Sequence, residues 1–173
     1  MSFAGYPRIA SAIDTLSNDF PFQTETRNNS DGTLYKVVRA YNGTGSAATA
    51  NACYVVRYDG DEETNPSIVA ASTSVTGTTA INYVVVATEA IAASSFGWYA
   101  IHGVYDVLVE GTTDVAKDDY LELVQSTSAT ALIKDGTSLT INSVAIACAA
   151  QAANSAVATR CFLFGERITL AAS

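Results

Sequence analysis

From residue 33 onward, apolar and β-branched residues recur in short stretches that are separated by turn-forming residues. The stretches are rich in Val, Ile, Thr and Tyr, and clusters of Gly, Asn, Asp and Ser break the chain at intervals typical of a β-sandwich or barrel. Asn-Gly and Asp-Gly pairs in these breaks accept the positive φ that tight hairpins require. The pattern predicts an all-β fold, a single β-sandwich or barrel-like body of about nine strands. The predicted strands cover residues 33–41, 52–58, 67–73, 80–88, 98–111, 119–127, 130–134, 138–149 and 156–165.

Two alanine-rich stretches complicate this strand pattern. Residues 88–95, "TEAIAASS", follow a β-branched run and have enough alanine for a short helix, which we keep as an alternative there. Residues 146–156, "IACAAQAANSA", also follow a β-branched run, and we interpret them as the end of a strand followed by a loop.

The first 32 residues differ in character from the rest of the chain. They contain Pro7 and Pro21, and the spacing of the apolar residues between these prolines indicates a short amphipathic helix. We therefore predict an N-terminal arm carrying a short helix, residues 1–32, followed by one β domain, residues 33–173. The apolar residues of the arm are too dispersed to form a core of their own, so we expect them to contact the body of the chain or another subunit. These residues are Phe3, Ile9, Ile13, Leu16, Phe20 and Phe22.

The composition favours a protein that is covered by partners. Hydrophobic residues make up 49% of the chain and charged residues only 15%, against about 25% charged in an average soluble domain. A neutral-polar surface costs little to desolvate on association. The net charge of -8 without a basic cluster argues against nucleic-acid binding. No window approaches 18 apolar residues and no secretory signal opens the chain, so we expect no membrane association.

The three cysteines do not form a metal-binding or disulfide pattern. Cys53, Cys148 and Cys161 are odd in number, far apart in sequence, and without a C-x-x-C pair. We interpret them as buried apolar thiols of a protein made in a reducing cytosol, and we expect neither a metal nor a cofactor.

His102 is the only histidine and the first candidate for catalysis. A Ser-His-Asp set would have to use it, but the chain has no G-x-S-x-G motif that would place a serine beside it. Strict alternation along the predicted strand puts Ala100, His102 and Val104 on one face and Tyr99 and its alternate neighbours on the other. We interpret His102 as a strand residue satisfied by a hydrogen bond, and the chain as not an enzyme.

Other candidate sites are weaker. The acidic stretch 59–63 has carboxylates that suit calcium but lacks EF-hand spacing, so we interpret it, like residues 117–119, as a solvated turn. Residues 42–46, "NGTGS", lack the lysine and the following helix of a phosphate-binding loop. Trp98 beside Tyr99 could stack on a sugar ring, although alternation sends the two rings to opposite faces and the inward one into the core.

The C-terminal half contains the stretches "GWYAIHGVYDVLVEGTTDVAKDDYLEL" and "VAIACAAQAANSAVATRCFLFG", separated by a polar insert. This arrangement, over about 70 residues, resembles the closing portion of small bacteriophage capsid decoration proteins. In that family an apolar strand ends in Gly, a short turn leads into "x-L-x-L", and the chain closes with "V-A-x-A-x-x-A" and a last apolar strand. The corresponding residues here are Gly103, Val115, Ala116, Asp118, Leu121, Val144, Ala145, Ala147 and Ala150.

The resemblance implies a cement protein without catalytic activity. It would bind the major capsid protein on the outer surface of an icosahedral head, stabilise the contacts between capsomers, and reside in the virion after synthesis in the host cytoplasm. A homo-oligomer is expected, with a trimer favoured where such proteins sit on three-fold positions. The alternative is a phage fibre or spike module that binds a host glycan through Trp98, Tyr99 and the loops after Tyr41 and Tyr58.

Overall fold

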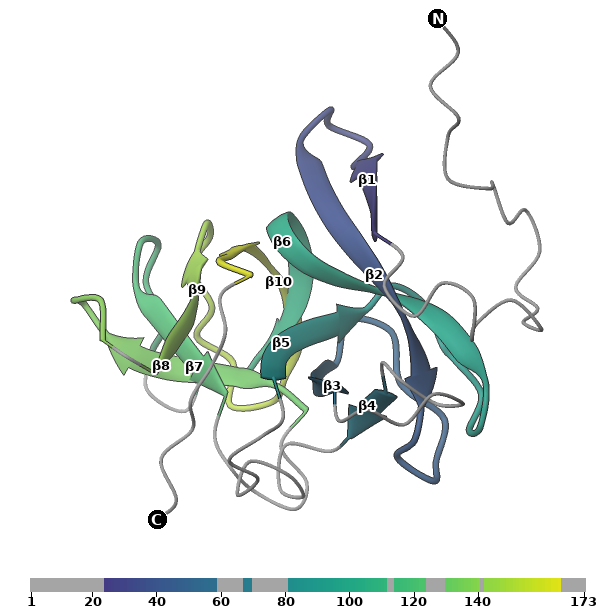
Figure 1. Cartoon of the computed structure of the whole chain (residues 1–173). Helices are drawn as coiled ribbons and strands as arrows, with labels where there is room; N and C mark the ends of the chain where they lie inside the picture. The colour runs from purple at the N-terminus through teal and green to yellow at the C-terminus, as the bar shows by residue number, and fades with distance from the viewer. Residues whose placement is uncertain are drawn as a thin grey trace, which may run out of the picture.

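The computed structural model describes residues 24–58, 67–69, 81–111, 114–123, 130–140 and 142–165. Its described part is all-β and contains no helix, which confirms the predicted fold class (Figure 1). Each of the nine predicted stretches overlaps one strand, and a tenth strand precedes them. The strands are β1 Thr24–Asn28, β2 Leu34–Asn42, β3 Cys53–Tyr58, β4 Ser67–Val69, β5 Ile81–Ala87, β6 Phe96–Val109, β7 Tyr120–Leu123, β8 Leu132–Gly136, β9 Ser143–Ala147 and β10 Val157–Leu163.

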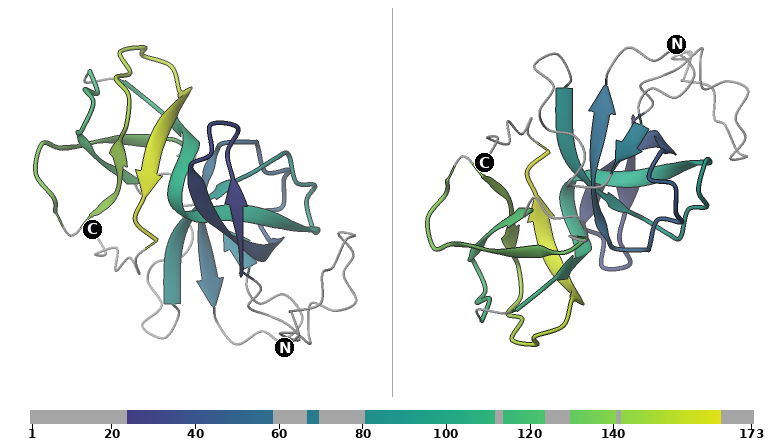
Figure 2. Two further views of the ribbon diagram at one scale, coloured as in Figure 1. Left: turned by 90° about the horizontal axis from the view of Figure 1, so that it is seen from above. Right: turned by 90° about the horizontal axis from the view of Figure 1, so that it is seen from below.

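All ten strands belong to one mixed sheet that closes on itself around β6. The strand order is β1-β2-β4-β3-β5-β6-β10-β9-β7-β8, with additional pairings of β6 to β2 and to β8. The pairing of β2 with β6 closes a first ring, which consists of β2, β4, β3, β5 and β6. A single-residue pairing of β6 with β8 closes a second ring, which consists of β6, β10, β9, β7 and β8. Figures 1 and 2 show the two rings side by side, with the long strand β6 running through both.

Strands β3 and β5 are buried on both faces over residues 53–56 and 84–87, which explains the apolar runs CYVV and VVVA. Along β3, Cys53 and Val55 belong to one core cluster and Tyr54 and Val56 to the other. Strand β5 alternates in the same way. A strand that is covered on both sides has no need for polar alternation. The two strands therefore separate the two hydrophobic cores.

A β-bulge in β6 corrects the strict alternation that we predicted around His102. The register between β2 and β6 shifts between Lys36 and Val37, because their partners are His102 and Ala100 and no residue of β2 pairs with Ile101. An extra residue in one strand reverses the side to which later residues point. Ala100 accordingly belongs to the same core cluster as Val107, an odd number of residues away. The prediction that Ala100 and His102 share a face is therefore wrong.

Strand β1 lies in the segment that the sequence analysis assigned to the arm. It pairs antiparallel with β2 in register from Thr24↔Val38 to Asn28↔Leu34. The sequence of β1, TETRN, has no apolar residue and so carries no alternation that could reveal a strand. Main-chain hydrogen bonds to β2, and not the burial of apolar side chains, therefore stabilise this strand.

The helix kept as an alternative at residues 88–95 is absent. Ile91 instead forms an isolated antiparallel bridge with Ala48, with N–H···O distances of 2.8 and 3.1 Å between the two backbones. The Ile91 side chain is buried in the first core. Tertiary packing of one isoleucine overrides the weak helical preference of the alanines. The second alanine-rich stretch is a strand end followed by irregular backbone, as predicted.

Candidate functional site

The contact residues predicted in the arm lie outside the described residues. These are Phe3, Ile9, Ile13, Leu16, Phe20 and Phe22, and the short helix predicted around them lies outside as well. They remain predictions. The candidate residues of the β domain can be placed, apart from the acidic stretch 59–63, which is also outside the described residues.

His102 lies on β6 beside the end of β10. Its Nδ1 is 2.8 Å from the carbonyl oxygen of Phe164, so Nδ1 carries the proton and donates to that oxygen. Its ring meets Phe162 edge to face, with 5.3 Å between the ring centroids. The half-buried imidazole thus joins two strands by one hydrogen bond and one ring contact. This matches the predicted strand histidine satisfied by a hydrogen bond.

The predicted turn at residues 117–119 contains a buried acid that the sequence analysis did not single out. Asp119 is 4% exposed, and its Oδ2 accepts from the Ala116 N–H at 2.7 Å and lies 2.6 Å from Lys134 Nζ. The hydrogen bonds from Lys134 and Ala116 hold the pKa of Asp119 below its usual value. Asp119 therefore fastens the turn before β7 to β8 and is not a solvated residue. Only the exposed Lys117 and Asp118 fit the predicted description.

The two aromatic residues considered for sugar binding do face opposite sides. Tyr99 is fully buried in the first core, and burial raises the pKa of its hydroxyl. Trp98 is partly exposed, but the Arg27 guanidinium lies 5.0 Å from the centre of its ring. A sugar would have to displace that cation–π contact to stack on this face of the indole.

Residues 42–46 form a loop that is organised by a buried asparagine. Asn42 is fully buried, and its Nδ2 lies within 3.1 Å of the carbonyl oxygens of Ser46, Ile91 and Ala92. Its Oδ1 accepts from the N–H of Thr44 at 3.1 Å and from the Thr44 hydroxyl at 2.8 Å. The side chain therefore ties the β2 end to the segment before β6. Its polar groups are therefore used inside the fold.

The cysteines are all free thiols. Cys53 and Cys161 are fully buried in the second core, and burial raises the pKa of both thiols, that of Cys161 to about 12. Cys148 is half-buried, so the prediction of buried apolar thiols holds for two of the three. No group of three or more His, Cys, Asp and Glu residues that could hold a metal occurs among the residues that the structure describes.

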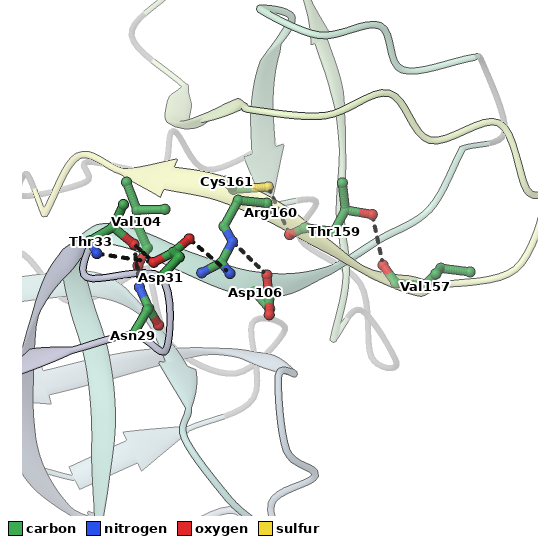
Figure 3. Close-up of polar contacts among 9 residues, drawn as sticks. All are labelled: Asn29, Asp31, Thr33, Val104, Asp106, Val157, Thr159, Arg160 and Cys161. Atoms are coloured by element: carbon green, nitrogen blue, oxygen red, sulfur yellow. Dashed lines mark hydrogen bonds and ion pairs between the residues drawn. The ribbon is translucent and has the colours of Figure 1, made fainter.

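The turn between β1 and β2 is attached to β6 and β10 by a set of polar contacts (Figure 3). Arg160 of β10 lies 3.1 Å from Asp106 of β6 and 3.5 Å from Asp31 in the turn. Asn29 donates to the backbone carbonyl of Val104 at 2.6 Å. Hydrogen bonds from Thr33 hold the pKa of Asp31 below its usual value. This cluster couples the hairpin of the first ring to the strands of the second.

The residues that carry the sequence resemblance occupy positions that shape the second ring. Gly103 adopts a positive φ where β6 passes β2, and Asp118, with φ of 71°, donates its N–H to the Ala147 carbonyl at 2.8 Å. Val115 bridges to Gln151 through two backbone hydrogen bonds. Leu121, Val144, Ala145 and Ala147 lie in the second core. Most of the motif residues thus lie in the core or at the turns of this ring, whereas Ala116 and Ala150 are exposed.

Gln151 is a structural residue that sequence reasoning missed. It is 7% exposed, and its Nε2 donates to the Val109 carbonyl at 2.8 Å, while its Oε1 accepts from the N–H of Ala153. A single glutamine in an alanine-rich loop offers no periodic signal. Asn42 does have a local signal, because an Asn followed by Gly and Thr is typical of a side-chain-organised turn.

Comparisons with known proteins do not assign the chain to a family: no protein-family model matches it and no curated protein sequence does. Among the described residues there is no helix of the length and hydropathy needed to span a membrane. The fold and its contacts therefore carry the functional argument.

We expect replacement of His102 with glutamine to lower the free energy of unfolding by about 1 kcal/mol or less. The glutamine amide can still donate to the Phe164 carbonyl, and only the ring contact with Phe162 is lost. Urea unfolding of both proteins checks this, with and without a chelator. A loss of several kcal/mol, or sensitivity to the chelator, would reopen the catalytic and metal hypotheses for His102.

Proposed function

We propose that this chain is a capsid decoration, or cement, protein of a bacteriophage. It binds the major capsid protein on the outer surface of an icosahedral head and stabilises the contacts between capsomers. In this proposal it is a homo-oligomer, takes no cofactor, performs no catalysis, and joins the virion after synthesis in the host cytoplasm.

One observation carries the proposal. The residues quoted for the resemblance to decoration proteins extend from Gly103 to Ala150 in the sequence, and most of them lie in the core or at the turns of the second ring. A resemblance that arose from strand composition alone would not need to select core and turn residues of one ring. This agreement between the motif and the places of its residues in the second ring supports a structural module that the chain shares with decoration proteins.

The physical character of the body suits a cement function. The two cores and the doubly buried β3 and β5 make a rigid platform. The surface is poor in charge, with 15% charged residues in the chain. A long segment precedes β1 and supplies apolar residues that can contact a neighbouring protein. The alternative of a glycan-binding fibre module is less well supported, because Arg27 lies over Trp98.

We expect deletion of residues 1–23 to leave a cooperatively folding protein that binds heads poorly. The cut falls before β1 because β1 pairs with β2 and because Asn29 contacts β6. Cosedimentation with heads that lack this protein measures the binding, and urea unfolding measures the fold. A full-length chain with Ser11 and Ser17 changed to alanine is the control and should bind normally. Unimpaired binding by the truncated chain would contradict an arm that contacts the capsid.

We expect the fraction bound to heads to stay constant or to rise between low salt and about 0.5 M salt, which shortens the Debye length several-fold. A chain with a net charge of -8 is repelled by like copies on the same shell, and salt screens this repulsion. The apolar and neutral-polar contacts are not weakened in the same way. Release of the protein at high salt would mean that its seventeen acidic residues bind a positive capsid surface.

A further inference from the structure

The outer face of the second ring carries a continuous row of apolar side chains. Tyr120 of β7 pairs with Ile146 of β9, Ile146 pairs with Phe162 of β10, and Phe162 pairs with Val104 of β6. Directly paired residues in a sheet point to the same side. All four are partly exposed, and their sequence neighbours Leu121 and Cys161 are buried in the second core, so the row faces outward.

Strand β2 extends this row by one residue. Tyr35 pairs with Gly103 in an antiparallel register, so Leu34 lies next to Val104. Leu34 is 57% exposed and belongs to the few large apolar side chains that are this exposed in the described part of the chain. We call Leu34, Val104, Phe162, Ile146 and Tyr120 the apolar row. It crosses five strands, a span of about 19 Å, with Phe162 at its centre.

Opposite charges lie beside the two ends of the apolar row, on the same side of it. Beyond Phe162, the chain leaves β10 and reaches Phe164, whose N–H donates to the Val144 carbonyl. Glu122 of β7 lies on this side because it pairs with Ser143, which precedes Val144, and it points outward like Tyr120. His102, which is hydrogen-bonded to the Phe164 carbonyl, pairs with Lys36. Lys36 thus flanks the Leu34 end and Glu122 flanks the Tyr120 end.

We propose that the apolar row binds the apolar row of a second copy of this chain around a two-fold axis that passes near Phe162. This axis lies in the plane of the contact and is perpendicular to the row. It reverses the direction of the row, so that the Leu34 end of one copy meets the Tyr120 end of the other. The side of the row is preserved, so Lys36 of each copy meets Glu122 of the other. One self-complementary face then forms two equivalent ion pairs around an apolar centre.

The charge distribution favours a second copy as the occupant. Two chains that each carry -8 repel at long range, and a contact between them needs local charges that compensate this repulsion. The two Lys36–Glu122 contacts provide this compensation. On the other side of the row, Arg160 is already paired with Asp106 and Asp31 of the same copy. A self-complementary face gives a pair and therefore favours a dimer over the trimer expected from the sequence.

The inference is independent of the proposed function, because it is tested on the isolated protein without heads. Sedimentation velocity of the full chain over about 1–100 µM, a range that brackets micromolar affinities, should show a dimer. Lys36→Glu and Glu122→Lys should each weaken dimerisation about ten-fold, because each replaces two attractions with two repulsions. The double variant Lys36→Glu/Glu122→Lys restores opposite charges and should dimerise within about three-fold of the native chain.

Three further variants separate this contact from its alternatives. Glu89→Lys changes the net charge as Glu122→Lys does, but at an exposed loop of the first ring, and should not weaken dimerisation. Phe162→Ser should weaken it about a hundred-fold, since a central aromatic contributes to both halves of the contact. A chain that ends at Gly165 should dimerise like the native one.

Several results would overturn the proposal. The full chain could remain monomeric throughout the concentration range, or form a trimer that the charge variants leave unchanged. The double variant could be weakened as much as the sum of the single variants. Dimerisation that appears only after removal of residues 166–173 would show that the chain's own C-terminal segment covers the row. Thermal unfolding of every variant identifies those that have lost their fold, and the charge variants provide the test if Phe162→Ser is one of these.

Discussion

Replacement of Gly103 with alanine is expected to lower the free energy of unfolding by about 3–4 kcal/mol. Gly103 has a φ of +95°, which a residue with a Cβ atom adopts only at a cost of about 1–2 kcal/mol. A Cβ at this position would also lie 2.5 Å from the Leu34 carbonyl oxygen and 2.8 Å from the Tyr35 Cα. Both atoms belong to backbone that is paired with β6, so they can move only if the two strands separate. Overpacking of this kind adds about 1–3 kcal/mol.

The chain contains a matched control for this substitution. Gly45 also has a positive φ, +79°, but a Cβ added there would meet no atom within 4 Å. Gly45→Ala should therefore lower the free energy of unfolding only by the cost of the positive φ, about 1–2 kcal/mol. Urea unfolding of both variants at the same temperature separates the two contributions. Equal losses would mean that β2 and β6 do not approach each other closely at Gly103.

Replacement of Asn42 with alanine is expected to lower the free energy of unfolding by about 3 kcal/mol. The substitution removes the donor to three backbone carbonyls and the acceptor for two Thr44 groups at a fully buried position. A buried polar group that loses its partner costs about 1–3 kcal/mol, and more than one group is affected here. The loop at residues 42–46 should also open, which hydrogen exchange of the Thr44 amide would detect.

Ser46→Ala is the control for the Asn42 variant. Ser46 is exposed and accepts the hydrogen bond from Asn42 through its backbone carbonyl, which alanine keeps. Its free energy of unfolding should therefore change by no more than about 0.5 kcal/mol. A loss below about 1 kcal/mol in the Asn42 variant would contradict the view that this side chain organises the loop, because it would imply that water replaces the lost partners at no cost.

Local patterns in the sequence were sufficient to predict nine of the ten described strands. Each β-branched run between turn residues became a strand, because alternation and β-propensity act over a few neighbouring residues. The turn at Asp118 and the core positions Leu121, Val144 and Ala145 belong to the motif that suggested the family resemblance. The contact residues of the arm stay predictions, because they lie outside the described residues.

The sequence by itself determined the fold class and the identity of most strands, whereas the tertiary structure decided how they pair. β1 has no apolar residue and is a strand only because it pairs with the edge of β2. The bulge opposite Lys36 turned His102 and Val104 outward and, with the register of β10, aligned Val104 with Phe162. Asn42 and Gln151 acquired their roles from carbonyls as far as 50 residues away. Such pairings depend on which distant segments meet, and periodicity within one segment carries no information about its partner.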